Sequence, residues 1–154
     1  MKGCAILSIS VRRSLLLLLC VLGFVSGGCI EAIAYRPNEN LVENVGMLEA
    51  QQRLKEILLH SIDPPVVEAE VTDDGFIYRY KQFIAGFATG ALLENRASFA
   101  NAAHVEIFAN NLVLVQTSTK HPLARLIFGN EPDTRLFADL VTSFHRRYLQ
   151  KSAQ

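Results

Sequence analysis

Cysteine is scarce in this sequence, and tryptophan is absent. The three cysteines, Cys4, Cys20 and Cys29, all lie near the start of the 154 residues, and none follows Cys29. The chain beyond Cys29 therefore cannot form an internal disulfide. A chain of this length can bury an ordinary hydrophobic core without such cross-links.

Several catalytic and ligand-binding motifs are also missing. No histidine pair has HExxH or another metal-ligand spacing, and there is no GxSxG nucleophile elbow. Gly86 and Gly90 lack the lysine of a phosphate-binding loop. The sequence therefore predicts no catalytic, cofactor-binding or metal-binding residues, no cofactor and no enzyme activity. The histidines are His60, His104, His121 and His145.

No apolar run is long enough to cross a bilayer. The longest runs from Leu15 to Val25, whereas a spanning helix needs roughly 20 apolar residues. Basic residues precede this run, and Ser26-Gly27-Gly28 follow it. A basic start, a short apolar core and small residues predict a secretory signal peptide at 1–28. An uncleaved anchor helix is the alternative, but Glu31 would be costly in lipid.

The end of this segment, Ser26-Gly27-Gly28-Cys29, resembles the lipobox of bacterial lipoproteins. In that family a peptidase cuts before the cysteine, which carries diacylglycerol. The small residues and the cysteine match, whereas Ser26 stands where the family usually has leucine. The resemblance implies a membrane anchor through lipid on Cys29. Ile30 replaces the aspartate that often signals inner-membrane retention, which implies the outer membrane, facing the periplasm.

A second cleavage site competes with the first. Ala32-Ile33-Ala34 fits the small-x-small pattern of ordinary signal peptidase, which would release a chain beginning at Tyr35. A lone cysteine in an exported protein needs a reason, and acylation supplies one. The alternative is an incidental cysteine that is lost with the signal.

The charge changes once the signal is removed. Three of the 15 basic residues and none of the 15 acidic ones lie in 1–28, which leaves 12 against 15. A mildly acidic domain is a poor candidate for nucleic acid, because nucleic-acid binders carry basic stripes. We expect a tether at 29–40 and a single globular domain at 41–154.

Helical spacing predicts two helices. The first covers Leu41 to Ser61, with Asn40 and Glu43 placed as a capping box. The second covers Pro132 to Gln150. Its apolar stripe comprises Leu136, Phe137, Leu140, Val141, Phe144 and Tyr148.

Between the helices the apolar period changes to two. Asp74-Gly75 predicts one hairpin, Asn110-Asn111 predicts another, and "PLARLIFGN" supplies a further strand. For Phe83 to Ala102 we expect a buried strand with glycine bends. A ligand-lining or membrane-touching loop is the alternative. The fold class is therefore α+β, with an N-terminal and a C-terminal helix.

This layout, with "ARLIFGN" and the amphipathic "DTRLFADLVTSFHRR", resembles the pleckstrin-homology-like barrel superfamily over Val66 to Arg147. The resemblance implies an antiparallel barrel plugged by the last helix, and an open antiparallel sheet is the competing architecture. Lipid-binding members use basic residues around the first hairpin and a tryptophan in the last helix. Here the turn is Asp73-Asp74-Gly75 and tryptophan is absent, so phosphoinositide recognition does not carry over.

Few residues remain as candidates for chemistry. His104 and Glu106 share a strand face, which a solvated surface explains equally well. The sequence thus predicts a non-enzymatic envelope lipoprotein with a binding or assembly domain. Its partners would be the membrane, through Cys29, and an envelope protein. The alternative is a soluble exported domain that binds a small apolar ligand at Phe83 to Leu93.

Overall fold

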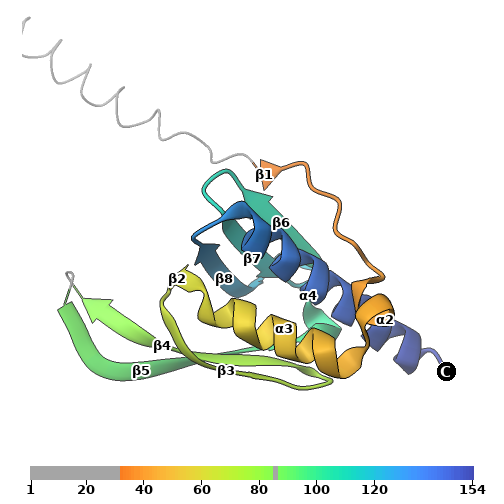
Figure 1. Cartoon of the computed structure of the whole chain (residues 1–154), viewed down its shortest axis with the longest axis horizontal. Coiled ribbons are helices and arrows are strands. Elements are labelled where there is room, and N and C mark those ends of the chain that lie inside the picture. The colour runs from red at the N-terminus through yellow and green to blue at the C-terminus, as the bar shows by residue number, and fades with distance from the viewer. Residues whose placement is uncertain (1–31, 85–86) are drawn as a thin grey trace, which may run out of the picture. The chain divides into compact units, whose positions relative to one another are not determined.

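The computed structural model describes residues 32–84 and 87–154 (Figure 1). It confirms an α+β fold with antiparallel sheets and a C-terminal helix. In chain order the elements are β1 Ala32–Ile33, α2 Leu41–Val45, α3 Met47–Leu59, β2 Ser61–Asp63, β3 Val66–Val71, β4 Gly75–Ile84, β5 Phe87–Ser98, β6 His104–Phe108, β7 Leu112–Gln116, β8 Pro122–Phe128 and α4 Glu131–Ser152. A single 3₁₀ turn, Phe99–Asn101, links β5 to β6.

The strands form two separate antiparallel sheets. One has the order β1-β6-β7-β8-β2, and the other has the order β3-β4-β5. Helix α4 packs against β6, β7 and β8, whereas α3 packs against β3 and α4 (Figure 1). The described strands form open sheets rather than a closed barrel. The relation to the pleckstrin-homology-like superfamily therefore stays a prediction.

The expected N-terminal helix is two helices with a break at Gly46. Gly46 has φ +88°, a left-handed conformation that glycine adopts at little cost, and its N–H donates to Val42 O. The expected capping box is wrong, because the side chain of Asn40 makes no cap hydrogen bond. Its Oδ1 instead accepts a 2.8 Å bond from Nη1 of Arg146 on α4.

Helix α4 confirms the second predicted helix and is slightly longer. Asn130 caps it, since Asn130 Oδ1 accepts from the Asp133 N–H at 2.8 Å. Phe137, Leu140 and Phe144 on its apolar stripe are buried. Among the described residues, no helix is both long enough and apolar enough to cross a membrane.

Both predicted hairpins are present, but Thr72, Asp73 and Asp74, rather than Asp74-Gly75, link the strands of the first, which gives a different purpose to Gly75. It lies at the start of β4, where an added Cβ would come within 2.3 Å of Ala97 O on β5. Close approach of the two strands, rather than a positive φ, therefore requires glycine here. In the second hairpin Asn111 does adopt a positive φ of 58°.

An aromatic cluster at the centre joins the two sheets. The centroid of the Phe137 ring on α4 lies 5.9 Å from the centroid of the Phe76 ring on β4 and 5.3 Å from that of the Phe128 ring on β8. Phe99 and Phe144 stack beside this group at 4.5 Å. All five rings are buried, so one side chain of α4 contacts both sheets at once.

The β4–β5 hairpin extends beyond the third strand of its sheet. Strand β3 pairs with β4 only as far as Tyr80, whereas β4 and β5 remain paired to Phe87. The strand prediction for this region is confirmed, and Ala97, Phe99 and Ala102 are buried as expected, but the expected burial is wrong at the hairpin end. The side chains of Phe83 and Phe87 are 51% and 79% exposed, because no third strand or helix in the described part of the chain covers this end.

We expect Phe137→Ala to lower the free energy of unfolding by about 3–5 kcal/mol, because it removes the ring that contacts both sheets. Leu149→Ala on the same helix is the control, since Leu149 is 52% exposed. Urea unfolding of the purified protein measures both values. Similar midpoints for the two variants would contradict a central role for Phe137.

Candidate functional site

Cys29, the predicted lipid-attachment residue, lies outside the described residues, and the fold begins almost directly after it. Ala32 pairs with Phe108 and Ile33 with Ile107, so β1 forms the edge of the five-stranded sheet (Figure 1). Much of the segment expected to be a tether therefore lies on the domain. Its role as the link to a membrane stays a prediction.

The residues after β1 are held against α4 by polar contacts. The Tyr35 hydroxyl donates to Asp139 Oδ1 at 2.6 Å, and the Asn38 N–H donates to the same oxygen at 2.7 Å. The guanidinium of Arg135 lies over the Tyr35 ring, 5.5 Å from its centroid. These contacts fix the path by which the chain enters the domain.

The contact with Asp139 changes the acidity of Tyr35. Burial of the phenol and then its hydrogen bond to the carboxylate raise the pKa of Tyr35 well above its ordinary value of 10.0. The neutral phenol, which can donate to Asp139, is thus the form that the fold favours. Alkaline pH, which removes the phenol proton, therefore weakens the hydrogen bond between Tyr35 and Asp139.

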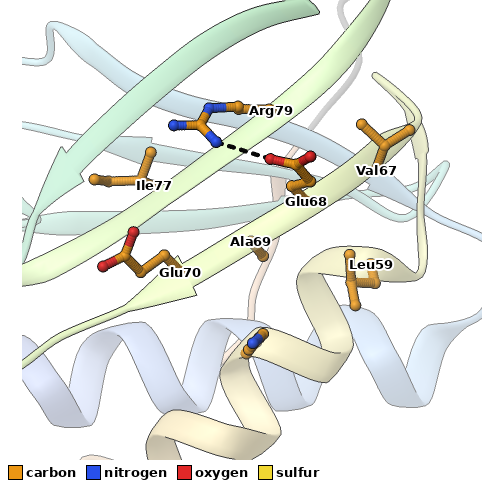
Figure 2. A pocket seen from close by; sticks show the side chains of 8 residues that line it. Leu59, Val67, Glu68, Ala69, Glu70, Ile77 and Arg79 are labelled. Carbon is orange, nitrogen blue, oxygen red and sulfur yellow. Dashed lines mark hydrogen bonds and ion pairs between the residues drawn. The ribbon is translucent and has the colours of Figure 1, made fainter.

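A hollow of about 370 Å³ is lined by residues of α3, β3 and β4. Figure 2 shows Leu59 and Val67 at one end of it and Glu70 and Ile77 at the other. Lys55, Glu68, Ala69 and Arg79 complete the lining. Its charged groups have both signs, so the hollow offers no clear preference for an anionic or a cationic ligand.

Charged side chains cover the outer face of the three-stranded sheet. Arg79 donates to Glu68 at 2.8 Å (Figure 2) and to Glu94 at 2.8 Å, and Arg96 donates to Glu94 at 2.7 Å. Hydrogen bonds first from Arg96 and then from Arg79 lower the pKa of Glu94. These groups are exposed, so their pairing adds little to stability and mainly keeps the face polar.

A second open hollow, the tyrosine cleft, lies where β4 and β5 approach β8. It has a volume of about 530 Å³. Tyr78 is buried at its base, where its hydroxyl accepts a 2.6 Å bond from Asn95 Nδ2. The cleft is lined by Asp63, Pro64, Tyr78, Tyr80, Glu94, Asn95, Pro122, Leu123, Ala124 and Arg125.

The floor of the tyrosine cleft connects the two sheets. Asn95 Nδ2 on β5 also donates to Leu123 O on β8 at 3.0 Å. Burial raises the pKa of Tyr78, and the bond with Asn95 opposes this in part. Aromatic faces combined with an amide and charged groups can hold a small polar or aromatic molecule.

The histidines are not brought together into one site. His60 Nδ1 lies 3.0 Å from Asp133 Oδ2, and His145 Nδ1 lies 2.6 Å from Phe99 O. His104 and His121 are both exposed at one end of the β6–β7–β8 meander, where Gln116 of β7 lies between β6 and β8. Among the described residues, no three His, Cys, Asp or Glu side chains are grouped so that they could hold a metal ion.

The sequence reasoning missed two of these features. The contact between Tyr35 and Asp139 joins residues 104 positions apart, and no local pattern indicates it. The tyrosine cleft was also missed. Tyr78 and Tyr80 are two positions apart on β4, a spacing that says nothing of β8 opposite them.

We expect the free energy of unfolding to fall as the pH rises above about 10. There the tyrosines of the unfolded chain lose their protons, while Tyr35 and Tyr78 in the folded protein keep theirs. Below that pH the contribution is fully present. Tyr35→Phe should lower the free energy of unfolding by about 1 kcal/mol at neutral pH, allowing for solvent screening. It should also make the free energy of unfolding fall less steeply above pH 10. Urea unfolding below and above pH 10 measures both effects.

Asp139→Asn is the matched control, because it keeps an oxygen acceptor but removes the charge that opposes the phenolate. We expect its alkaline loss to lie between those of the unmodified protein and Tyr35→Phe. The same alkaline slope in all three proteins would contradict the assignment to Tyr35.

Comparison of the chain with models of protein families, with curated proteins and with solved structures finds no match. The proposed function therefore rests on the residues, contacts and charges of the chain itself.

Proposed function

We propose that this chain is an exported envelope lipoprotein, held to a membrane by lipid on Cys29, whose domain acts by binding or assembly rather than by catalysis. The motif at residues 26–29 supports the anchor. The net acidic charge of 29–154 favours a protein partner in the envelope over nucleic acid. Ile30 favours the outer membrane, with the domain facing the periplasm.

The observation that carries this proposal is the position of β1. Cleavage after Ala34 would remove both residues of β1 and expose the edge of β6. Cleavage before Cys29 leaves the whole described domain intact. The fold thus favours the cut that also supplies an acylated cysteine.

A second function has a specific observation in its favour. The volume of the tyrosine cleft falls in the range of small-molecule sites, roughly 300–1,000 Å³. A soluble exported domain that holds a small ligand there is the competing proposal. Native mass spectrometry distinguishes the two, because only the second expects a co-purified small molecule and a chain without acyl groups.

We expect Cys29→Ser to move the protein from the membrane fraction to the soluble fraction or to leave the precursor uncut. Cys20→Ser is the matched control, since it changes a cysteine within the predicted signal. Fractionation, with the intact mass of the native protein, measures the outcome. A mature chain that begins at Tyr35 would refute the anchor, and so would one that carries an unmodified Cys29.

A further inference from the structure

The β4–β5 hairpin exposes several large apolar side chains toward its end. Phe83 is 51% exposed, Phe87 79%, Leu92 48% and Leu93 37%. No charged residue occurs in the sequence between Lys81 and Glu94. Isolated exposed apolar residues are common, but a cluster on one element indicates a contact surface.

This surface is not part of the core. Four residues of β4 lie beyond Tyr80, the last partner of β3, which corresponds to about 13 Å of strand. In Figure 1 the hairpin extends away from the helices and the other strands. Burial within the domain therefore does not explain why the side chains at its end are apolar.

We propose that this hairpin end, comprising Phe83, Phe87 and Leu92, inserts into the surface of the lipid bilayer. The location of that bilayer rests on the proposed function, in which Cys29 carries the anchor. Only Ile30 and Glu31 separate Cys29 from β1, a span of about 11 Å when fully extended. An anchored domain therefore stays next to the lipid, where an exposed apolar element can reach it.

The backbone limits how far the hairpin enters. Strands β4 and β5 pair with each other near the end, but within the described residues each leaves its outer edge without a partner strand there. Unpaired backbone groups are excluded from the hydrocarbon core, so insertion stops near the boundary between headgroups and acyl chains. Lys81, which pairs with Leu92, marks the depth at which charge begins again, and Glu94, which pairs with Arg79, lies farther from the end.

The sequence favours lipid over a charged protein partner. A hairpin end without charge offers no ion pairs for specificity, whereas apolar insertion needs none. The hairpin would set the orientation of the domain, because a lipoprotein's several acyl chains already supply stable attachment. Salt should therefore change insertion little, since ionic screening acts on charges.

The test uses the mature acylated protein in vesicles of phosphatidylethanolamine and phosphatidylglycerol. In Phe87→Cys the new thiol is the one that a polarity-sensitive dye can label, because acylation blocks Cys29 and the signal is removed. We expect a roughly threefold rise in dye emission on vesicles, with quenching by nitroxide lipids, as the dye leaves water. Leu48→Cys is the control, since Leu48 is 80% exposed on α3.

A second substitution tests the whole surface. Phe83→Ser in the Phe87→Cys protein should reduce quenching by nitroxide lipids, whereas Leu149→Ser should not. Both residues are exposed, so we expect both variants to fold, which circular dichroism checks. Equal, water-like emission from positions 87 and 48 would overturn the inference. So would a dye that is shielded in native envelopes but unaffected by nitroxide lipids, since a protein would then cover it.

Failure of the anchor is a separate result. If mass spectrometry shows no acyl chains on Cys29, the proposed function is wrong. In that case Phe87→Cys is combined with Cys29→Ser, so that position 87 again carries the thiol that the dye labels, and the labelled chain is mixed with the same vesicles. Emission that rises and is quenched by lipid still supports insertion of the hairpin, and unchanged emission refutes it.

Discussion

The contact of the Phe137 ring with Phe76 and Phe128 is the interaction on which the rest of the described structure depends. Among the described strands, none of one sheet is hydrogen-bonded to a strand of the other. Helix packing and a few side-chain hydrogen bonds must therefore hold the two sheets together. Burying large aromatic rings supplies most of the free energy for this, because each ring removes a large apolar area from water. The tyrosine cleft and the base of the β4–β5 hairpin keep their positions only while α4 stays in place.

The same helix also holds the N-terminal part of the domain. Ser143 Oγ accepts the buried N–H of Val42 at 2.8 Å, and Asp139 and Arg146 bind the residues just before it. One face of α4 therefore fills the core, while the other fixes the segment that leads back to Cys29. Under the proposed function, a pull on the anchor would act on the most buried helix of the domain.

Local patterns were enough to predict α4 and both hairpins, because periodicity and turn residues act over a few positions. The polar ties of Tyr35 and Asn40 to α4 connect residues more than 100 positions apart, and nothing nearby in the sequence indicates them. The apolar residues after Tyr80 gave the right strand but the wrong environment. The hydrophobicity of a side chain shows that its removal from water is favourable. Only the tertiary structure shows whether the side chain is buried within the protein itself.

The three-stranded sheet treats its two ends differently. Near its base, Glu68, Arg79 and Glu94 form ion pairs on the outer face. These charges disfavour association with other sheets. Past Tyr80 the hairpin has unpaired strand edges and exposed phenylalanines, a combination that favours aggregation in water. A domain that protects one end with charge and leaves the other apolar needs something to cover the second. Under the proposed function, the bilayer that holds Cys29 would cover it without any further protein.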